Sequence, residues 1–339
     1  MFGAGGVKTF GMTNAKQSTG IEGLAAELRA LGLDVSVNQP LAELGTFQLG
    51  GPCALLVEAP GPEDVIQAAR ATRAAGRTPL FIGGGSNLLF SDAGYDGVLI
   101  RHLSSIPRIR REEHVLEVDA GTVLDDLAAA AAGQGLAGLE ALHGIPGTLG
   151  GAVAGNAGAW GRQIGDAVES ARLLQPDGTV VEVAGGELDF GYRCSRLQRT
   201  GEHLLTCRLR VTPGDRDALL VERARILALR AEKHPDWRVD PCIGSIFRNL
   251  EPTSKAERRQ AAGHLLEQVG AKEMSVGGAR LFPKHANIVI KGPGCTAQDV
   301  CDLIARMRAA VEDRFGVVLR REVRYLGEFD NEPRQPGFH

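Results

Sequence analysis

The chain has 339 residues, of which 43% are hydrophobic and 23% are charged, and its formal net charge is −3. This composition is typical of a globular protein with room for two or three domains. The charge balance gives no electrostatic basis for nucleic acid as the main partner, because proteins that bind duplexes normally carry a basic field or stripe. No nucleic-acid partner is therefore expected.

Six cysteines are spread along the chain without a Cys-x-x-Cys pair or a His/Cys ligand spacing, which argues against a zinc site or an iron–sulfur cluster. The N-terminus has no apolar signal-peptide core, and no segment reaches the ~18 unbroken apolar residues of a membrane span. We therefore expect a cytoplasmic protein with free buried thiols, no bound metal and no membrane association. A monomer is a separate expectation, which none of these features decides.

The first structural signals follow a polar lead-in. Residues 1–19 are small and polar, which predicts disorder, and the apolar spacing over 21–32 predicts a short helix. A second helix is expected from Pro62, which suits a first helical position, to a stop at Gly76. Two buried strands should follow, over residues 79–82 and 97–101.

The middle of the chain mixes strands with one alanine-rich helix. Thr122 is the expected cap of that helix, which should run through Ala132 and end at Gly133 and Gly135. Alternating patterns predict strands over residues 115–119, 171–174, 179–183 and 203–211. A Pro176-Asp-Gly turn should join the second of these strands to the third.

The dipeptide Pro213-Gly214 marks a boundary before the last part of the chain. Helices are predicted from Asp215 to Lys233 and from Ala297 to Phe315, and a strand over 317–326. Strands and helices do not alternate regularly, so the predicted class is α+β and not a doubly wound parallel sheet.

Two glycine-rich runs are the most informative local feature. Residues 144–161 contain seven glycines, a density that argues against a regular helix because glycine costs roughly 1 kcal/mol per helical position. A second run, Gly-Gly-Gly-Ser-Asn, occupies residues 83–87. Neither is a Walker A or Gly-x-Gly-x-x-Gly motif. Bare glycine backbone can aim N–H groups at an anion, so the pair predicts a dinucleotide diphosphate gripped from two sides.

Three separated motifs resemble those of the UDP-N-acetylenolpyruvoylglucosamine reductase family. They are Thr46-Phe-Gln-Leu-Gly-Gly-Pro, Gly83-Gly-Gly-Ser-Asn-Leu-Leu and Gly144-Ile-Pro-Gly-Thr-Leu-Gly-Gly-Ala-Val. The resemblance runs from Leu41 to Phe329. It implies a flavoprotein that uses FAD and NADPH to reduce UDP-N-acetylglucosamine enolpyruvate to UDP-N-acetylmuramate, a step of peptidoglycan synthesis on which cell-wall biogenesis, cell shape and cell division depend.

The same resemblance implies the fold. The family has a two-subdomain FAD-binding scaffold of the vanillyl-alcohol-oxidase (PCMH) type, followed by an α+β substrate domain. We therefore expect the following division: a disordered lead-in (1–19), FAD-binding subdomains (20–103 and 104–213), a substrate-binding domain (214–329) and a flexible tail (330–339).

Three residues are implied to act in the reaction. Ser245, in Gly-Ser-Ile-Phe-Arg-Asn, matches the family's proton donor, and Arg193, in Tyr-Arg-Cys-Ser, matches the arginine that stabilises the developing aci-carboxylate. Glu322 matches the family's terminal catalytic glutamate and would need a raised pKa beside a carboxylate. Without the resemblance, a salt bridge would be the simpler interpretation of both Arg193 and Glu322.

Binding residues follow from the same motifs. The expected FAD contacts are Gly83, Gly84, Gly85, Ser86, Asn87, Leu88, Ile145, Pro146, Gly147, Thr148, Gly150, Gly151, Asn156 and Gly158. The expected substrate contacts are Tyr192, Lys233, Asn249, His285 and Asn287, with Lys233 on the diphosphate and Asn249 also near the nicotinamide.

The chain departs from the family pattern at a few positions. Arg248 replaces the usual lysine and Leu250 the usual proline, while Gly45 and Trp160 stand where asparagine and tyrosine are common. Only a few polar residues separate Ser195 from the strand at residue 203, which leaves no room for the substrate-covering loop of one family subtype. The chain therefore resembles the loop-less type II subtype.

Two other interpretations remain open. The first is an oxidase on the same scaffold that acts on a sugar alcohol or lactone. Such enzymes often attach the flavin through a loop His or Cys, and residues 83–87 offer neither. The second is a nucleotide-sugar sensor that has lost catalysis, against which the presence of Ser245, Arg193 and Glu322 argues.

Overall fold

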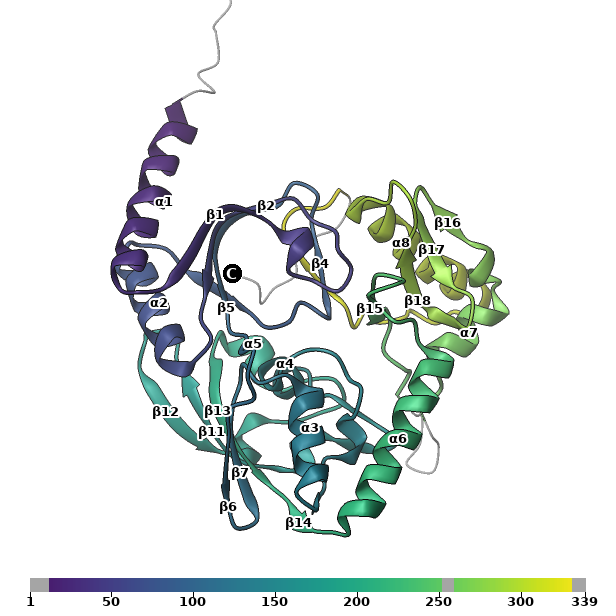
Figure 1. The fold of residues 1–339 in the computed structure, drawn as a ribbon. Helices are drawn as coiled ribbons and strands as arrows, with labels where there is room; N and C mark the ends of the chain where they lie inside the picture. The colour runs from purple at the N-terminus through teal and green to yellow at the C-terminus, as the bar shows by residue number, and fades with distance from the viewer. Residues whose placement is uncertain (1–11, 252–258, 331–339) are drawn as a thin grey trace, which may run out of the picture.

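The computed structural model describes residues 12–251 and 259–330. Within that part, three sheets of four or five strands each contribute to a hydrophobic core of their own (Figure 1). Helices and strands are mixed along the chain, so the expected α+β class is confirmed. In the described ranges, no helix combines the length and apolar character needed to cross a membrane.

The first sheet contains β1 (Asp34–Pro40), β2 (Pro52–Glu58), β3 (Pro79–Ile82) and β5 (Tyr95–Arg101). Its order is β1-β2-β5-β3, with β1 antiparallel to β2 and the other neighbours parallel. Helices α1 (Met12–Ala30) and α2 (Pro62–Ala74) pack on it, and Leu28 and Val65 are fully buried there. The predicted strand at 79–82 and the helix start at Pro62 are confirmed, and Gly76 follows α2 with φ +72°.

Helix α1 begins earlier than the sequence pattern predicts. Residues 12–19, expected to be disordered, belong to this helix, while residues 1–11 lie outside the described residues. Ile21, Leu24 and Leu28 are buried and fix the later turns. Extending a formed helix adds one hydrogen bond per residue without a new nucleation cost, which accounts for the longer element.

The second sheet contains β6 (Ile109–Glu112), β7 (Val115–Asp119), β11 (Val168–Leu174), β12 (Val180–Ala184) and β13 (His203–Arg210). Its order is β12-β11-β13-β7-β6, and all neighbours are antiparallel. Helices α3 (Leu124–Gly133) and α4 (Leu149–Ala154) pack into its core. The predicted cap Thr122 is wrong, because α3 is preceded by Val123 and the buried Thr122 hydroxyl instead accepts a hydrogen bond from the Arg108 amide.

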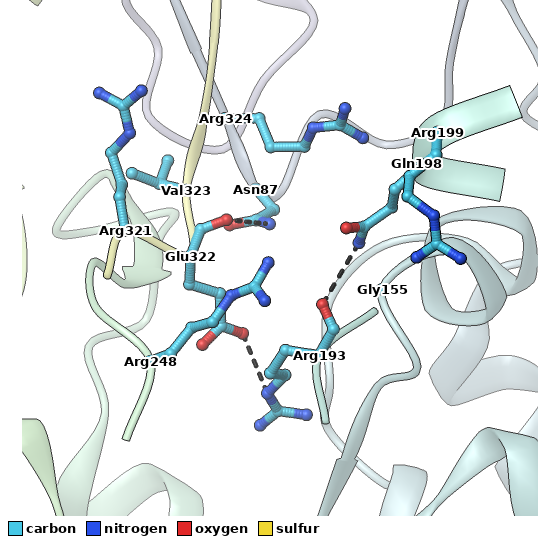
Figure 2. Close-up of a pocket in the computed structure, with 10 residues that line it drawn as sticks. All are labelled: Asn87, Gly155, Arg193, Gln198, Arg199, Arg248, Arg321, Glu322, Val323 and Arg324. Atoms are coloured by element: carbon cyan, nitrogen blue, oxygen red, sulfur yellow. Dashed lines mark hydrogen bonds and ion pairs between the residues drawn. The ribbon is translucent and has the colours of Figure 1, made fainter. Parts of the chain in front are cut away.

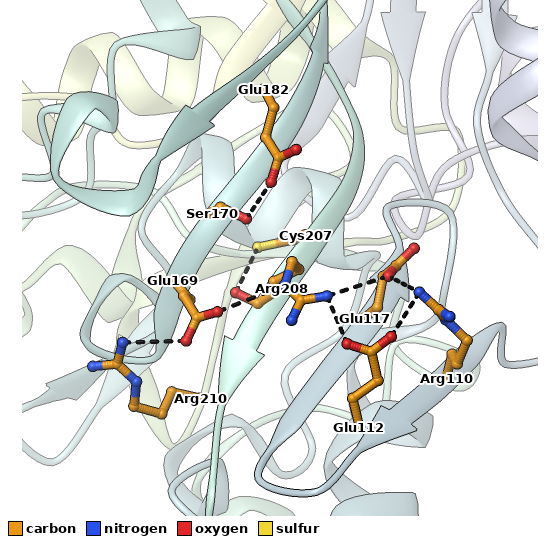
Figure 3. A network of polar contacts seen from close by, with 9 residues as sticks. All are labelled: Arg110, Glu112, Glu117, Glu169, Ser170, Glu182, Cys207, Arg208 and Arg210. Atoms are coloured by element: carbon orange, nitrogen blue, oxygen red, sulfur yellow. Dashed lines mark hydrogen bonds and ion pairs between the residues drawn. The ribbon is translucent and has the colours of Figure 1, made fainter.

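A charged network lies on the second sheet (Figure 3). Arg208 pairs with Glu112 at 2.9 Å, and Arg110 pairs with Glu117 at 2.6 Å across the strands. Ion pairs between exposed side chains contribute little to stability, because water and salt screen them. The network therefore balances charge on this surface and adds little to stability.

The third sheet contains β15 (Cys242–Ser245), β16 (Ser275–Val276), β17 (Ala279–Phe282) and β18 (His285–Lys291), in the antiparallel order β15-β18-β17-β16. It shares a core with α7 (Ala262–Gln268) and α8 (Ala297–Phe315), and α6 (Arg216–Lys233) leads into it from the second sheet (Figure 1). Helices α6 and α8 confirm two predictions, and the Asp215 and Thr296 side chains cap them.

Remaining elements are short. They are β4 (Leu88–Phe90), β8 (Leu136–Ala137), β9 (Gly158–Ala159), β10 (Arg162–Gln163), β14 (Thr212–Pro213), β19 (Arg324–Leu326), α5 (Leu197–Thr200) and the 3-10 turns at 41–43, 140–142, 164–166, 185–188 and 271–273. The predicted strand at 317–326 is formed only by its last three residues as β19. The expected boundary at Pro213-Gly214 lies at the end of β14, just before α6, and the division into domains stays a prediction.

The first and third parts of the chain are joined by side chains that cross between them. Phe47, Leu49 and Leu89 lie in the core of the third sheet. The Asp92 carboxylate, far away in sequence, accepts hydrogen bonds from the Ala297 and Gln298 amides at 2.9 and 3.0 Å. These amides lie at the start of α8, so Asp92, from the first part of the chain, caps a helix that packs on the third sheet.

Replacing Asp92 with alanine should therefore lower the free energy of unfolding by about 1–2 kcal/mol, because two amides at the start of α8 lose their acceptor. Urea denaturation measures the change. Asp313→Ala, which removes an exposed carboxylate from the last turn of the same helix, is the control and should leave stability unchanged or slightly higher. Equal effects of the two variants would show that Asp92 does not cap α8.

Candidate active site

The two glycine-rich loops touch each other. The Ser86 hydroxyl donates a hydrogen bond to the Pro146 carbonyl at 3.1 Å, and a side chain at Gly83 would collide with the Thr148 hydroxyl. Gly147 has φ +111°, and a Cβ there would lie 2.6 Å from Ser86 Oγ. Glycine is thus required at the contact. The two loops predicted to grip a diphosphate therefore lie in direct contact, and the grip itself stays a prediction.

The first loop offers a run of free amides. The backbone N–H groups of residues 83–87 make no hydrogen bond to another described residue. Gly85 has φ +65°, and a Cβ there would come within 2.8 Å of the Leu44 carbonyl, so only glycine fits. Successive unbonded amides in such a turn form a concave donor set for an anion. These residues fit a diphosphate.

The second loop runs into helix α4, although its glycines predicted no helix. Thr148 caps α4 by accepting a hydrogen bond from the Gly151 amide at 3.3 Å, and Leu149 and Val153 are fully buried. Their burial offsets the low helix propensity of glycine. The Gly150 amide donates to Ala120, which leaves the amides at 147 and 148 as the unbonded donors of this loop.

An ionic cluster holds the start of the second loop. Asp125 accepts a hydrogen bond from the Gly144 amide at 2.7 Å and pairs with both terminal nitrogens of Arg223 at 2.6 and 2.8 Å. Arg223 also contacts His143 Nδ1 at 2.7 Å. Because arginine only donates, His143 must be neutral and accept, and burial together with Arg223 lowers its pKa. Helix α6 is thereby fastened to the predicted flavin loop.

Two of the predicted FAD contacts are used inside the chain. The Asn156 side chain donates to the Gly191 carbonyl at 2.8 Å and accepts from the Gly165 amide at 3.0 Å. Gly158 lies in the tight β9–β10 pairing, where a Cβ would collide with the Arg162 carbonyl. Both arrangements favour a structural role, in which Asn156 supports the segment that carries Arg193.

A cavity of about 380 Å³ lies where the loops meet the C-terminal segment (Figure 2). Its lining is dominated by arginine and includes one carboxylate. The lining residues are Asn87, Gly155, Arg193, Gln198, Arg199, Arg248, Arg321, Glu322, Val323 and Arg324. Asn87 ends the first loop, so the free amides and the charged groups belong to one region. The excess of positive charge suits an anionic ligand.

Arg193 and Glu322 are brought together at this cavity. Arg193 Nε lies 3.1 Å from Glu322 Oε1, and the two form an ion pair without a well-aligned hydrogen bond (Figure 2). Arg193 has φ +57°, and its carbonyl accepts a hydrogen bond from Gln198. Burial raises the pKa of Glu322, while Arg193 and Arg248 act in the opposite direction. Glu322 is thus a carboxyl group whose proton is held more tightly than usual.

Ser245 lies beside this pair through the backbone. It ends β15 after Gly244, whose φ is +75°, and the carbonyl of the next residue, Ile246, accepts a hydrogen bond from the Glu322 amide at 2.7 Å. Ser245 does not line the cavity itself. The structure therefore joins Arg193 and Glu322 directly and places Ser245 on the neighbouring segment.

The predicted substrate residues differ in position: some lie beside the cavity or near the end of α6, and one, Asn287, is buried. The Tyr192 hydroxyl accepts a hydrogen bond from the Asn249 amide at 3.3 Å beside the cavity. Lys233 is exposed at the end of α6, and the His285 ring lies 5.6 Å from that of His234. Asn287, in contrast, is buried. Its side chain donates a hydrogen bond to the Phe247 carbonyl at 2.8 Å and accepts one from the Phe247 amide at 2.9 Å. This favours a structural role for Asn287.

Comparisons with known proteins decide the family. Residues 53–184 match the model of an FAD-binding domain, and residues 235–326 match the UDP-N-acetylenolpyruvoylglucosamine reductase C-terminal domain. The chain is 36% identical over 297 residues to UDP-N-acetylenolpyruvoylglucosamine reductase 1 of Bacillus cereus (strain ZK / E33L), covering 86% of this chain and 95% of the relative. The chain belongs to the UDP-N-acetylenolpyruvoylglucosamine reductase family.

Further members of the reductase family agree. The Gloeobacter violaceus enzyme is 38% identical over 289 residues, covering 85% of this chain and 94% of the relative. The crystal structure of the Thermus caldophilus reductase superposes with a TM-score of 0.70 at 29% identity, covering 87% of this chain and 99% of that one. The FAD-binding scaffold followed by a family-specific C-terminal domain, expected from the motifs, is confirmed.

Some residues at the site were not identified from the sequence. Asp125, His143 and Arg223 lie in different elements, and no motif links them. Arg324 follows Glu322 by two residues and lines the same cavity. Its spacing from Glu322 in the C-terminal motif is the one sequence feature that could have identified it. Arg248 stands out in the sequence only as a departure from the family lysine.

Asp125→Asn should weaken FAD binding about tenfold or more and lower stability by about 1–3 kcal/mol, because Arg223 loses its half-buried ionic partner and Gly144 its charged acceptor. Titration of the apoprotein with FAD, followed by flavin fluorescence, measures the affinity. Asp126→Asn removes the same charge at the adjacent exposed position and should change neither property. An unaltered FAD affinity in Asp125→Asn would show that the cluster does not position the loop.

Proposed function

We propose that this chain uses NADPH and bound FAD to reduce UDP-N-acetylglucosamine enolpyruvate to UDP-N-acetylmuramate in the cytoplasm, as a step of peptidoglycan synthesis. The observation that carries the proposal is the contact between Arg193 and Glu322 in a cavity that Asn87, from the predicted FAD loop, also lines. The names of the related reductases support the same reaction.

The free amides of residues 83–87, 147 and 148 would hold the FAD diphosphate. When bound, the flavin supplies the hydride for one carbon of the substrate double bond. The protein must then steady the carboxylate and deliver a proton to the other carbon. Each of these tasks has a residue of suitable chemistry in the region.

Arg193 would hold the substrate carboxylate with its planar fork, and Glu322 would share a hydrogen bond with that carboxylate through its retained proton. Ser245 would deliver the proton to the carbon. A hydroxyl is a weak acid, so this transfer requires a strongly basic intermediate and a short path. The hydrogen bond from the Glu322 amide to the Ile246 carbonyl, next to Ser245 in the chain, supports this proposal.

Substrate binding would extend from the cavity toward the end of α6. Tyr192 and Asn249, which are joined by a hydrogen bond from the Asn249 backbone amide to the Tyr192 hydroxyl, would contact the substrate there. Lys233, as a compact exposed cation, would pair with the substrate diphosphate, and His285 would line the uridine-sugar pocket. We propose that the enzyme acts as a monomer.

Absorption spectroscopy of the FAD-loaded protein tests the proposal directly. Anaerobic NADPH should bleach the flavin band, and adding UDP-N-acetylglucosamine enolpyruvate should restore it with formation of UDP-N-acetylmuramate. A protein that takes up no flavin, or whose reduced flavin is reoxidised by oxygen but not by this substrate, would contradict the proposed function.

Ser245→Ala separates the two halves of the cycle. Flavin reduction by NADPH should continue near the wild-type rate, whereas product formation should fall about 10²–10⁴-fold, since the proton donor is missing. Stopped-flow measurement of each half-reaction provides the comparison. Equal losses in both halves would indicate a structural role for Ser245.

The pH dependence of substrate-driven flavin reoxidation should report the protonation state of Glu322. Its raised pKa means that the proton is present at low pH and is lost as the pH rises through that value, so the rate should decline on the alkaline side. Glu322→Gln keeps a hydrogen-bond donor that does not titrate, and its lower rate should be flat over the same range. A variant that retains the alkaline decline would exclude Glu322 as the titrating group.

A further inference from the structure

Most arginines of the cavity have a partner for their charge. Arg193 pairs with Glu322, and Arg199 pairs with Asp189 on the rim. Arg321 lies over the Tyr325 ring at 3.5 Å and points away from the cavity centre (Figure 2). The residue that differs is Arg248, which forms no ion pair or side-chain hydrogen bond with another described residue.

Arg248 is fixed in place by its backbone. Its amide donates to the Arg320 carbonyl at 2.9 Å, and Phe247 forms a bridge with Arg321. The segment at 246–248 therefore runs antiparallel to the segment at 320–322 that carries Glu322. The Arg248 side chain extends from this ladder into the cavity beside the Glu322 carboxylate (Figure 2).

The environment of Arg248 is costly without a ligand. Its Nε is buried and has no hydrogen-bond partner among the described residues, and a buried donor left unsatisfied destabilises a protein. Arg248 also lies close enough to Arg324 to help lower the pKa of that side chain to about 10, although burial is the larger cause. Two cations in contact with one cavity favour an anion between them.

We propose that Arg248 is a second carboxylate-binding residue, which holds the substrate's enolpyruvyl carboxylate together with Arg193. This inference rests on the proposed function. When hydride adds to one carbon of the double bond, the electron pair moves onto the carboxylate, whose charge changes from one negative to two until a proton reaches the other carbon. Arg193 already forms an ion pair with Glu322, so a second guanidinium is needed to balance the added negative charge of the substrate.

The position also favours arginine over the family's lysine. A guanidinium presents two parallel N–H donors to the two oxygens of a carboxylate, whereas an ammonium offers a single point charge. Arg248→Lys should therefore keep part of the function, and Arg248→Met should lose it. Arg320→Met is the matched control, because Arg320 is exposed on the paired segment and does not line the cavity.

The experiment compares two nucleotides with the FAD-loaded enzyme. UDP-N-acetylmuramate carries the carboxylate and UDP-N-acetylglucosamine does not. Binding of each nucleotide is measured by the perturbation of the flavin spectrum. Arg248→Met should weaken binding of UDP-N-acetylmuramate about 10–100-fold and leave binding of UDP-N-acetylglucosamine within about twofold of the wild type. Arg248→Lys should fall between, and Arg320→Met should match the wild type.

The kinetic result should follow the same order. Reoxidation of reduced flavin by the enolpyruvyl substrate should slow in Arg248→Met, while flavin reduction by NADPH should stay near the wild-type rate. Equal binding of the carboxylated nucleotide by Arg248→Met and Arg320→Met, or equal loss of both nucleotides, would overturn the inference. Absence of turnover in the wild type would instead count against the proposed function, and the binding comparison still decides the role of Arg248.

Discussion

Three residues near the C-terminal end of the described chain, Arg324–Leu326, pair in parallel with Leu88–Phe90, which directly follow the first glycine loop. Two further bonds fasten the same segment to that loop, from Asn87 Nδ2 to the Glu322 carbonyl at 3.3 Å and from the Arg324 amide to the Asn87 carbonyl at 3.1 Å. On its other side, the segment bonds to Ile246. One extended stretch thus lies between the predicted flavin loop and the segment of Ser245, and the site depends on it.

The position of this stretch also explains the charge environment of Glu322. Glu322 is carried into a cavity rich in arginine, where burial favours its protonated form and the neighbouring cations favour the ionised one. Removing one member of such a group leaves a buried charge without its partner. A cavity with several guanidinium groups and one carboxyl is suited to take up an anion and to tolerate an increase in its charge during reaction.

The sequence predicts local structure here better than long-range assembly. Helices α6 and α8 have clear caps and periodicity, and both are confirmed. Helix α4 was missed because burial and a Thr148 cap override glycine propensity. Strand β19 pairs with a strand more than two hundred residues earlier, and Asn87 contacts Glu322 across 235 positions, so no local pattern could join them. Ser245, Arg193 and Glu322 are predicted from family motifs, which mark Arg248 only as a departure from the family lysine and do not include Asp125.

A crystal structure of the FAD complex would test the central claim most directly. The account predicts diphosphate oxygens about 2.7–3.2 Å from backbone amides of residues 83–87 and of Gly147 or Thr148, with the flavin ring reaching the cavity that Arg193 and Glu322 line. A diphosphate bound away from both loops, or a ring that leaves the Arg193–Glu322 pair on a separate surface, would contradict it.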